Sequence, residues 1–319
     1  MAEIFRFQPL LQPTIWGGHK LARLKGVETS DAIGESWEIS GVEGHETVVA
    51  GGPCQGLTLS QLVAHMKDHL VGASVYRRFG DHFPLLIKFI DARRDLSIQV
   101  HPNDEIARRH GQPMGKTEMW YVLPSEPGAR LYNGLKRAID AETLARMVAD
   151  KTITEALAQY EVSEGDVYFI PAGRIHAIGA GCMVAEIQQT SDTTYRLYDY
   201  DRRDAEGHLR PLHVEQAAEC IDYHVQPDYR THYQPAVNAA TKVVTCHYFT
   251  TLVMHVSGTA AFDCTPLDTF VIIMAVGGEG TLTADDNTTA VQAGHTLLLP
   301  ASTAHIEATG SMTLLLTYV

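Results

Sequence analysis

The chain has 319 residues, roughly twice the length of an average domain, so we expect either one large core or two linked ones. Charged residues make up 20% and apolar residues 45% of the chain, which excludes collagenous, coiled-coil and wholly disordered classes. The formal net charge of −13 argues against nucleic acid as a main partner, because binding to a phosphate backbone needs a basic face.

The sequence shows no targeting or membrane signal. Residues 1–18 have neither the basic start nor the long apolar run of a secretory signal. The longest apolar run, residues 270–276, is far shorter than the roughly 20 residues that a membrane helix needs. The 5 cysteines are widely spaced and form no CxxC pair, which indicates neither a disulfide framework nor a cysteine zinc site. We therefore expect a cytoplasmic protein without a membrane span.

Two segments are predicted to be helical. Residues 58–79 open with a capping-box pattern at Thr58 and carry apolar residues at a spacing of four. Residues 140–160 have Asp140 as the expected N-cap and a break near Lys151. Elsewhere, short apolar alternations bounded by Gly, Pro and Asp predict many short strands, as in a sandwich or a barrel. We therefore expect a mostly β fold with small helical additions in the N-terminal half.

An internal repeat relates residues 165–176 to residues 294–305. In both segments a Gly, a Pro and a His stand at the same spacing: Gly165, Pro171 and His176 in the first, Gly294, Pro300 and His305 in the second. This pattern resembles the second sequence signature of the cupin barrel, and its occurrence twice resembles a bicupin, a pair of jelly-roll β-barrels. We expect a catalytic, metal-binding domain over residues 1–225 and a degenerate C-terminal barrel over residues 240–319, joined by a linker.

Period-two alternation predicts polar faces on two strands inside the first barrel. Ser97, Gln99 and His101 share one face, because successive side chains of a strand point to opposite sides. By the same alternation, Lys116 and Glu118 share a face with Trp120. A polar strand face directed into a barrel needs a ligand or a set of polar partners.

Four of these inward residues suit a divalent metal, and they are Gln99, His101, Glu118 and His176. Zinc is the first choice, but the set holds no thiolate, so iron or manganese fits almost as well. Taken singly, each His is more simply explained as a hydrogen-bonded structural residue. The second repeat has no matching His and Glu pair near residues 268–276, so we expect a metal-free C-terminal barrel with a structural His305.

Several buried charges are also predicted. Lys88 and Lys116 lie on strand faces that point inward, where either an anionic ligand or a buried salt bridge would accompany them. Glu186 alternates with Ile187, and either Glu186 or Lys116 can serve as a proton carrier. The tryptophans of the N-terminal half are expected to be core residues, although they can also line a sugar site.

Seven ordered segments together resemble the type I mannose-6-phosphate isomerases in their shorter bacterial form. They are residues 16–18 (WGG), 34–37 (GESW), 83–88 (FPLLIK), 96–102 (LSIQVHP), 115–121 (GKTEMWY), 171–179 (PAGRIHAIG) and 186–199. Each is weak alone, but the ordered set is specific. The large helical insertion that longer members carry between the barrels is missing.

The resemblance implies a set of site residues. It matches Gln99, His101, Glu118 and His176 to the zinc ligands, and Arg196 to the catalytic arginine. It also places five residues in or near the substrate pocket: Lys88, Ser97, Lys116, Glu186 and Arg202. On the residues alone, the favoured interpretation of Arg196 is a structural ion pair with a nearby carboxylate such as Asp199 or Asp201.

The resemblance also implies the reaction, an interconversion of mannose 6-phosphate and fructose 6-phosphate through a cis-enediol. This chemistry needs a base, a cation that stabilises the enediolate and an anchor for the phosphate. We therefore expect an isomerase with a hexose 6-phosphate substrate and one Zn²⁺ per chain, a monomer by default. Two alternatives are an iron-dependent cupin oxygenase that uses the same ligands and a non-catalytic sugar-binding bicupin.

Overall fold

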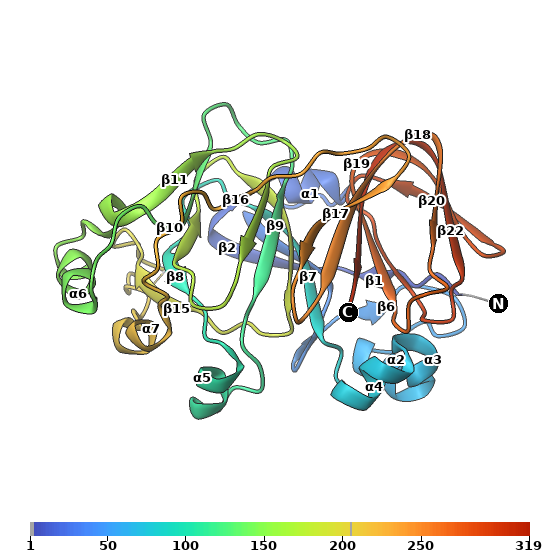
Figure 1. Cartoon of the computed structure of the whole chain (residues 1–319), viewed down its shortest axis with the longest axis horizontal. Helices are drawn as coiled ribbons and strands as arrows, with labels where there is room; N and C mark the ends of the chain where they lie inside the picture. The colour runs from blue at the N-terminus through green and yellow to red at the C-terminus, as the bar shows by residue number, and fades with distance from the viewer. Residues whose placement is uncertain (1–2, 205) are drawn as a thin grey trace.

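The computed structural model describes residues 3–204 and 206–319 as a mostly β molecule with two halves side by side. Figure 1 shows the halves next to each other along the long axis, with the green and yellow strands in one and the orange and red strands in the other. The expected mostly β fold is confirmed, and none of the sheets closes on itself by strand pairing within the described part of the chain.

The N-terminal half consists of two sheets. Its seven-stranded sheet has the order β16 (Arg230–Thr231), β12 (Val167–Ile170), β9 (Glu118–Val122), β14 (Met183–Gln189), β7 (Leu85–Asp91), β3 (Ile33–Ile39) and β2 (Leu10–Gly18). Its five-stranded sheet has the order β11 (Leu157–Glu161), β10 (Arg130–Leu135), β13 (His176–Ile178), β8 (Ile98–Val100) and β15 (Tyr195–Tyr198). Trp120 and Val184 of the first sheet pack in one buried cluster with Leu131 and Ile178 of the second, so the two sheets face each other.

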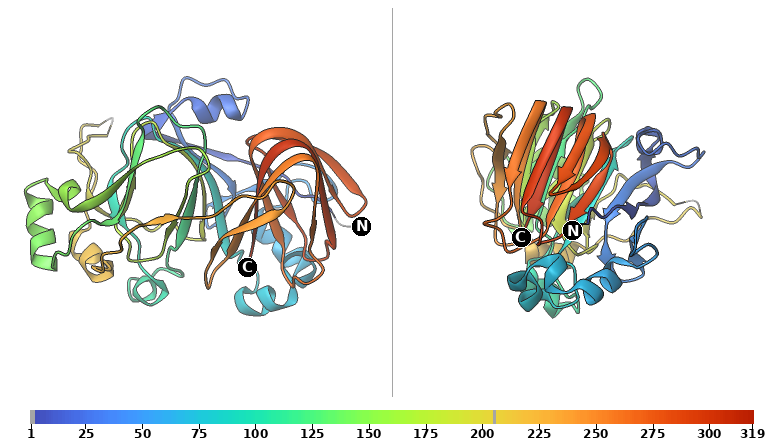
Figure 2. Two further views of the ribbon diagram at one scale, coloured as in Figure 1. Left: turned by 45° about the horizontal axis from the view of Figure 1, so that its top comes forward. Right: turned by 90° about the vertical axis from the view of Figure 1, so that its right-hand side faces the viewer.

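The C-terminal half is a six-stranded sheet with long, curved strands (Figure 2). Its strands are β17 (Ala240–Thr245), β18 (Thr250–Asp263), β22 (His305–Tyr318), β19 (Val271–Ala284), β20 (Asn287–Gln292) and β21 (Thr296–Leu299), the last paired with β19. Two small sheets complete the structure: β1 (Phe7–Gln8) pairs with β6 (Val48–Val49), and β4 (Gly41–Val42) pairs with β5 (His45–Glu46). The curved C-terminal strands enclose an apolar core of their own.

The segment 58–79 forms three helices where the sequence predicts one. They are α2 (Leu59–Met66), α3 (Asp68–Val71) and α4 (Ala73–Phe79). The chain breaks at Lys67, with φ 51°, and at Gly72, with φ 91°, because neither residue has a helical backbone. The predicted capping box at Thr58 is confirmed.

The segment 140–160 also differs from the prediction. Helix α6 (Ala141–Ala149) begins after the expected cap Asp140 and ends before Lys151, whose φ is 59°. A 3-10 turn, η1 (Ile153–Ala156), and strand β11 then follow. The predicted break is confirmed. The prediction of helix after residue 156 is wrong, because β11 (Leu157–Glu161) pairs with β10. The remaining helices are α1 (Lys20–Leu24), α5 (Asp104–Arg109) and α7 (Val214–Cys220).

The two repeat segments form equivalent elements. In each, a Gly with positive φ precedes a strand, β12 or β21, and the His opens the next strand, β13 or β22. The glycine torsions are similar, with φ 89° at Gly165 and 87° at Gly294. In each repeat the strand after the Gly pairs with an antiparallel neighbour: β12 pairs with β9, and β21 pairs with β19.

A large apolar cluster crosses between the halves. Phe5, Leu59 and Phe83 from the N-terminal half pack with Phe270 and Leu315 from the C-terminal sheet. Figure 1 shows α2, α3 and α4 beneath the C-terminal strands, although these helices belong to the first 80 residues of the sequence. Among the described residues, no helix has the length and hydropathy that crossing a membrane requires.

Candidate active site

A cavity of about 140 Å³ lies between the two sheets of the N-terminal half. Its walls carry two tryptophans and a high density of charge. The lining residues are Trp16, Glu35, Trp37, Lys88, Ile90, Leu96, Ser97, Gln99, Lys116, Ile178, Glu186, Asp192, Thr194, Arg196 and Arg210. The sheet faces that alternation predicts to be polar are therefore the faces that meet here.

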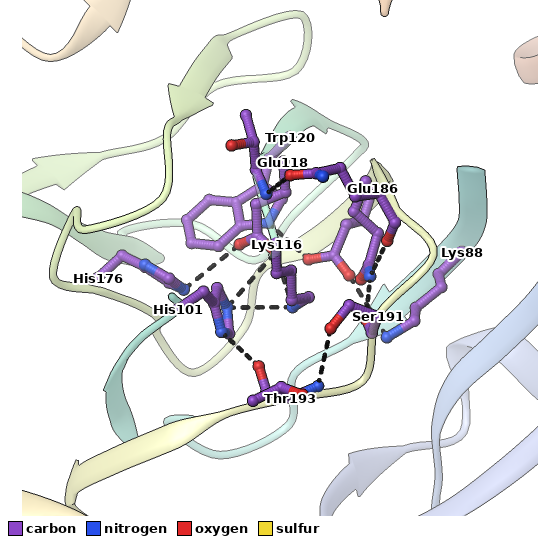
Figure 3. A network of polar contacts seen from close by, with 12 residues as sticks. Lys88, His101, Lys116, Glu118, Trp120, His176, Glu186, Ser191 and Thr193 are labelled. Atoms are coloured by element: carbon purple, nitrogen blue, oxygen red, sulfur yellow. Dashed lines mark hydrogen bonds and ion pairs between the residues drawn. The ribbon is translucent and has the colours of Figure 1, made fainter. Parts of the chain in front are cut away.

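Three side chains of metal-ligating types lie together behind Lys116 of the cavity wall, each at most 1% exposed. His101 follows β8, Glu118 opens β9 and His176 opens β13. The Nε2 atom of His176 is 3.3 Å from Oε1 of Glu118, and Nε2 of His101 is 3.5 Å from Oε2. Figure 3 shows the two rings and the carboxylate turned toward one another. The structure thus brings together three residues that are far apart in the sequence.

Backbone carbonyls set the orientation of both imidazoles. Nδ1 of His101 lies 2.9 Å from the carbonyl oxygen of Thr193, and Nδ1 of His176 lies 2.8 Å from that of Arg174. Because a carbonyl only accepts, each Nδ1 carries the hydrogen and each Nε2 carries a lone pair. Both lone pairs therefore point toward Glu118.

This donor set fits a divalent cation. Burial lowers the pKa of His176 to about 3, and it lowers the pKa of His101 well below the ordinary value, so both rings are neutral at neutral pH. Nε2 of His176 and Oε1 of Glu118 are buried without a hydrogen-bond partner. The Lys116 ammonium contacts His101 and Oε2 of Glu118, but the lone pair of His176 faces Oε1 of Glu118 at 3.3 Å, and the two repel each other unless a cation lies between them.

Gln99 lies beside this group on the five-stranded sheet. Its Cα is opposite those of His176 and Arg196 in the strand register, and its side chain lines the cavity. From this position the side-chain oxygen of Gln99 can serve as the fourth ligand, beside the two imidazoles and the carboxylate.

The two predicted inward lysines are buried and paired. Nζ of Lys116 lies 2.7 Å from Oε2 of Glu118 and 3.0 Å from Nε2 of His101 (Figure 3). Nζ of Lys88 lies 3.2 Å from Glu35 and 3.6 Å from Glu186. Burial lowers the pKa of Lys88, but the two carboxylates outweigh burial and the net shift is upward. Buried salt bridges are therefore present, and both lysines also border the cavity.

Glu186 on β14 is a buried carboxyl whose two oxygens have different surroundings. Its Oε2 accepts a hydrogen bond of 2.8 Å from Nε1 of Trp120, whereas its buried Oε1 has no hydrogen-bond partner. Burial, and next the charge of Glu118, raise the pKa of Glu186. A carboxyl whose pKa rises toward neutrality is suited to proton transfer.

Arg196 on β15 has no carboxylate partner in the parts of the chain that the structure describes. Its Nη1 donates to the carbonyl of Pro211 at 3.0 Å, and its buried Nε has no partner. Asp199 is occupied by other arginines, and Asp201 pairs with Lys151. The ion-pair interpretation of Arg196 is therefore wrong, and its guanidinium is available to a ligand.

Comparison with known proteins agrees with this geometry. The family model described as phosphomannose isomerase type I, catalytic domain, matches residues 4–128, and that of the mannose-6-phosphate isomerase cupin domain matches residues 239–319. Mannose-6-phosphate isomerase ManA of Bacillus subtilis is 38% identical, over 92% of each chain. This chain belongs to the type I phosphomannose isomerases.

Two further relatives support the assignment to the type I phosphomannose isomerases. A mannose-6-phosphate isomerase of Streptococcus mutans is 34% identical, over 94% of this chain and 93% of the relative. The crystal structure of the mannose 6-phosphate isomerase from Bacillus subtilis superimposes with a TM-score of 0.87 at 30% identity, over 99% of each chain. The resemblance found in the sequence and the cupin domain are confirmed.

Of the other predicted site residues, Ser97 lines the cavity and Arg202 lies outside it. Ser97 lines the cavity, as do Trp16 and Trp37, which the sequence favours as plain core. Arg202 does not line it, since its guanidinium lies on Asp199 and on the Asp95 carbonyl at an outer pocket.

The sequence reasoning missed three charged cavity residues, Glu35, Asp192 and Arg210. Glu35 shares a strand face with Trp37, so alternation could have found it. Arg210 lies in a loop without periodicity, where no sequence signal marks it. In the second repeat, His305 is exposed and its Nδ1 lies 3.6 Å from Asp263, in contrast to the buried His176.

Proposed function

We propose that this type I phosphomannose isomerase interconverts mannose 6-phosphate and fructose 6-phosphate through a cis-enediol. The observation that carries the proposal is a buried group of three metal donors next to a cavity lined by Glu186 and by Arg196, which has no carboxylate partner among the described residues. The names of the relatives in Bacillus subtilis and Streptococcus mutans give the same activity.

For the metal centre, we assign Gln99, His101, Glu118 and His176 as ligands of one Zn²⁺ per chain. The neutral imidazoles and the unpaired lone pairs support this assignment. When bound, the metal acts as a Lewis acid toward the substrate oxygens. Nitrogen and oxygen donors also accept iron or manganese, so the choice of zinc requires measurement.

For the proton transfer, we assign Glu186. Its Oε1 would take the proton from C2 of the aldose and return it to C1. The hydroxyl proton of O2 would pass to O1, and the carbonyl double bond would move from C1–O1 to C2–O2. The raised pKa of Glu186 supports this role, because a base works best with a pKa near the working pH. Lys116 is the competing carrier, but its ammonium is held by His101 and Glu118.

Among the remaining charged residues, we assign Arg196 the role of stabilising the negative charge that develops on the enediolate. A guanidinium keeps its charge at any working pH and offers paired donors to an oxyanion. Lys88 and Lys116 would bind the sugar oxygens from the wall opposite Arg196, and Ser97, which directly precedes β8, would bind them from the same side as Arg196. Arg202 would act from outside the cavity by holding Asp199.

For the architecture, we propose two jelly-roll barrels, a catalytic domain of residues 1–225 and a degenerate barrel of residues 240–319 without metal. The equivalent elements of the two repeats support this division. We further propose a cytoplasmic monomer, whose oligomeric state analytical ultracentrifugation would test directly.

The first experiment measures metal content by mass spectrometry and then fructose 6-phosphate formation from mannose 6-phosphate in a coupled assay. Both are measured on one sample before and after chelation. One zinc per chain with chelator-sensitive turnover is the expected result. Bound iron with turnover that requires dioxygen would favour an oxygenase, and neither metal nor turnover would leave a sugar-binding protein.

A further inference from the structure

The residues that line the cavity all belong to the N-terminal half, from Trp16 to Arg210. The C-terminal half reaches the N-terminal half at the turn between β17 and β18, where the side chain of Tyr248 bonds to helix α5. The turn has internal support, since the N–H of Cys246 donates to the carbonyl of Phe249 at 3.0 Å and Phe249 is only 1% exposed. Tyr248 is therefore held in place by its own half of the molecule.

The carboxylate of Asp104, the first residue of α5, collects hydrogen bonds from three distant segments. Its Oδ2 accepts one of 3.0 Å from the hydroxyl of Tyr248. Its Oδ1 accepts one of 2.8 Å from the N–H of Gly115 and one of 2.9 Å from Nε2 of Gln189. Burial alone would raise the pKa of Asp104, but these hydrogen bonds, with a smaller contribution from the charge of Arg108, outweigh burial and lower it. The group is therefore an ionised acceptor at neutral pH.

Gln189 connects Asp104 to the backbone of Thr117. Its side chain is 1% exposed, and its Oε1 accepts a hydrogen bond of 2.8 Å from the N–H of Thr117. The N–H of Gln189 also donates to the carbonyl of Thr117 at 3.1 Å, so one residue bonds both backbone groups of Thr117. Because the carboxylate only accepts and the N–H only donates, the amide of Gln189 has a single orientation that satisfies both.

The backbone beside Thr117 packs closely on the chain that leads from His101 into α5. A Cβ at Gly115 would lie 2.5 Å from the carbonyl carbon of Asn103, so a larger residue would push the two segments apart. The N–H of Lys116 donates to the carbonyl of Pro102 at 3.0 Å. The segment that carries Lys116 and the segment that carries His101 therefore fix each other's position.

We propose that Tyr248 is a positioning residue for the active site, through which the C-terminal half fixes the segment that carries Lys116 and Glu118. This inference rests on the proposed function, because it concerns the metal ligand Glu118 and the lysine beside it. Thr117 lies between these two residues, and Nζ of Lys116 is 2.7 Å from Oε2 of Glu118, so a displacement of Thr117 changes the contacts of both charges (Figure 3). The C-terminal half thus acts on the reaction without touching the substrate.

The test compares Tyr248→Phe, which removes the hydroxyl and keeps the ring, with two controls. Tyr76→Phe removes the same kind of bond, since the Tyr76 hydroxyl donates to Asp81 at 2.9 Å. Asp268→Ala removes other bonds between the halves, because its carboxylate accepts from the N–H groups of Ala73 and Ser74, each at 2.8 Å. Both controls concern α4, whereas Tyr248 bonds to α5.

Three readouts are measured on the purified full chain. They are the rate of metal release to a chelator, kcat for mannose 6-phosphate, and hydrogen exchange of residues 114–119 by mass spectrometry. We expect Tyr248→Phe to speed metal release and exchange and to lower kcat, each by about 10-fold, the loss of one hydrogen bond to a charged group. Tyr76→Phe should match the wild type. Asp268→Ala should lower the unfolding midpoint and leave the three readouts unchanged.

Asp104→Asn tests the second link of the same path. It places an amide where three donors converge, so we expect losses at least as large as those of Tyr248→Phe. Adding Tyr248→Phe to Asp104→Asn should then change little, because residues that act through one path are not additive. Fully additive losses would contradict the path from Tyr248 through Asp104.

Wild-type metal release, exchange and kcat in Tyr248→Phe would overturn the assignment. The same holds if either control gives losses as large as Tyr248→Phe, since the effect would then be one of general stability. If the wild type neither binds metal nor turns over substrate, the proposed function fails instead, and hydrogen exchange of residues 114–119 still decides the role of Tyr248.

Discussion

At the residue scale, the cavity consists of charges that depend on one another. Lys88, Lys116, Glu118 and Glu186 are each at most 5% exposed, and each lies within ion-pair distance of a partner. Removing one member of a buried pair leaves the other without compensation, which destabilises the fold by roughly 3 to 5 kcal/mol. Every loss of activity in a variant of these residues therefore needs a check on folding.

Arg196→Ala tests the role of this arginine in turnover. Arg196 has no carboxylate partner whose charge would be left unpaired among the described residues, so the fold and bound metal should persist. We expect turnover to fall by about 10³-fold or more, the upper range for losing one oxyanion stabiliser. The coupled isomerase assay and metal analysis check this on the same preparation. Near-normal activity would remove Arg196 from the reaction.

His101→Ala and Glu118→Ala test the metal ligands. Both residues are buried against His176, and we expect each variant to lose metal and activity together. His305→Ala is the matched control, because His305 is the equivalent residue of the second repeat and is exposed. Full metal occupancy in both ligand variants would refute the ligand set, and loss of metal in the control would mean that the C-terminal half binds metal.

Glu186→Gln tests the proton carrier. The amide keeps the size of the side chain and a hydrogen-bond acceptor for Trp120, but it cannot take a proton. We expect kcat to fall by about 10²- to 10⁴-fold, the usual contribution of a general base, with a smaller effect on KM. Lys116→Gln is measured alongside it. If the lysine variant loses turnover and the glutamate variant does not, Lys116 is the carrier.

At the element scale, the three short helices of residues 59–79 are stabilised by packing and caps. Leu59, Leu62 and Val63 of α2 are fully buried in the cluster that joins the halves, and each helix has at most 8 residues. Helices this short are unstable in isolation, so burial and the ends of each helix determine whether they form. The cap at Thr58 should therefore affect stability and leave the distant cavity unchanged.

Thr58→Ala tests that cap. The Thr58 hydroxyl accepts a hydrogen bond from the N–H of Gln61, and the Gln61 side chain accepts one from the N–H of Thr58. We expect the variant to lose about 1 kcal/mol of unfolding free energy. Urea denaturation measures the loss, and Thr58→Ser, which keeps the hydroxyl, is the control. A change in kcat would contradict a purely structural role.

At the scale of the whole molecule, the two halves share a core. The rings of Phe83 and Phe270 have centroids 4.6 Å apart, and the backbone of Phe5 exchanges hydrogen bonds with Leu298 of β21. Lys25, at the end of α1, also donates to the carbonyl of Gly294 in the second half. Such contacts between fully buried residues couple the stability of the halves.

Calorimetry tests this coupling. We expect a single cooperative unfolding transition, and we expect Phe270→Ala to lower the unfolding free energy by about 3 to 5 kcal/mol, the cost of a large cavity in a core. Because the halves share this cluster, the variant should shift the whole transition. Two transitions, of which only one moves, would show that the halves unfold independently.

The sequence by itself determined the strand faces and the residues that meet beneath the cavity. Period-two alternation assigns side chains to one side of a strand, so it is sufficient to direct His101, Glu118 and Glu186 toward the space between the two sheets of the N-terminal half. The repeat and the ordered motifs then indicated the family. These patterns are local, and their information lies within segments of a few residues.

Only the tertiary structure decided which distant charges pair. Arg210 and Asp199 meet because a loop without periodicity returns to β15, and Arg196 is left unpaired among the described residues because Asp199 is already occupied. The helix breaks at Lys67 and Gly72, and the replacement of helix by β11 after residue 156, likewise depend on packing against neighbouring elements. Long-range contacts of this kind result from the path of the chain in space, which no short segment encodes.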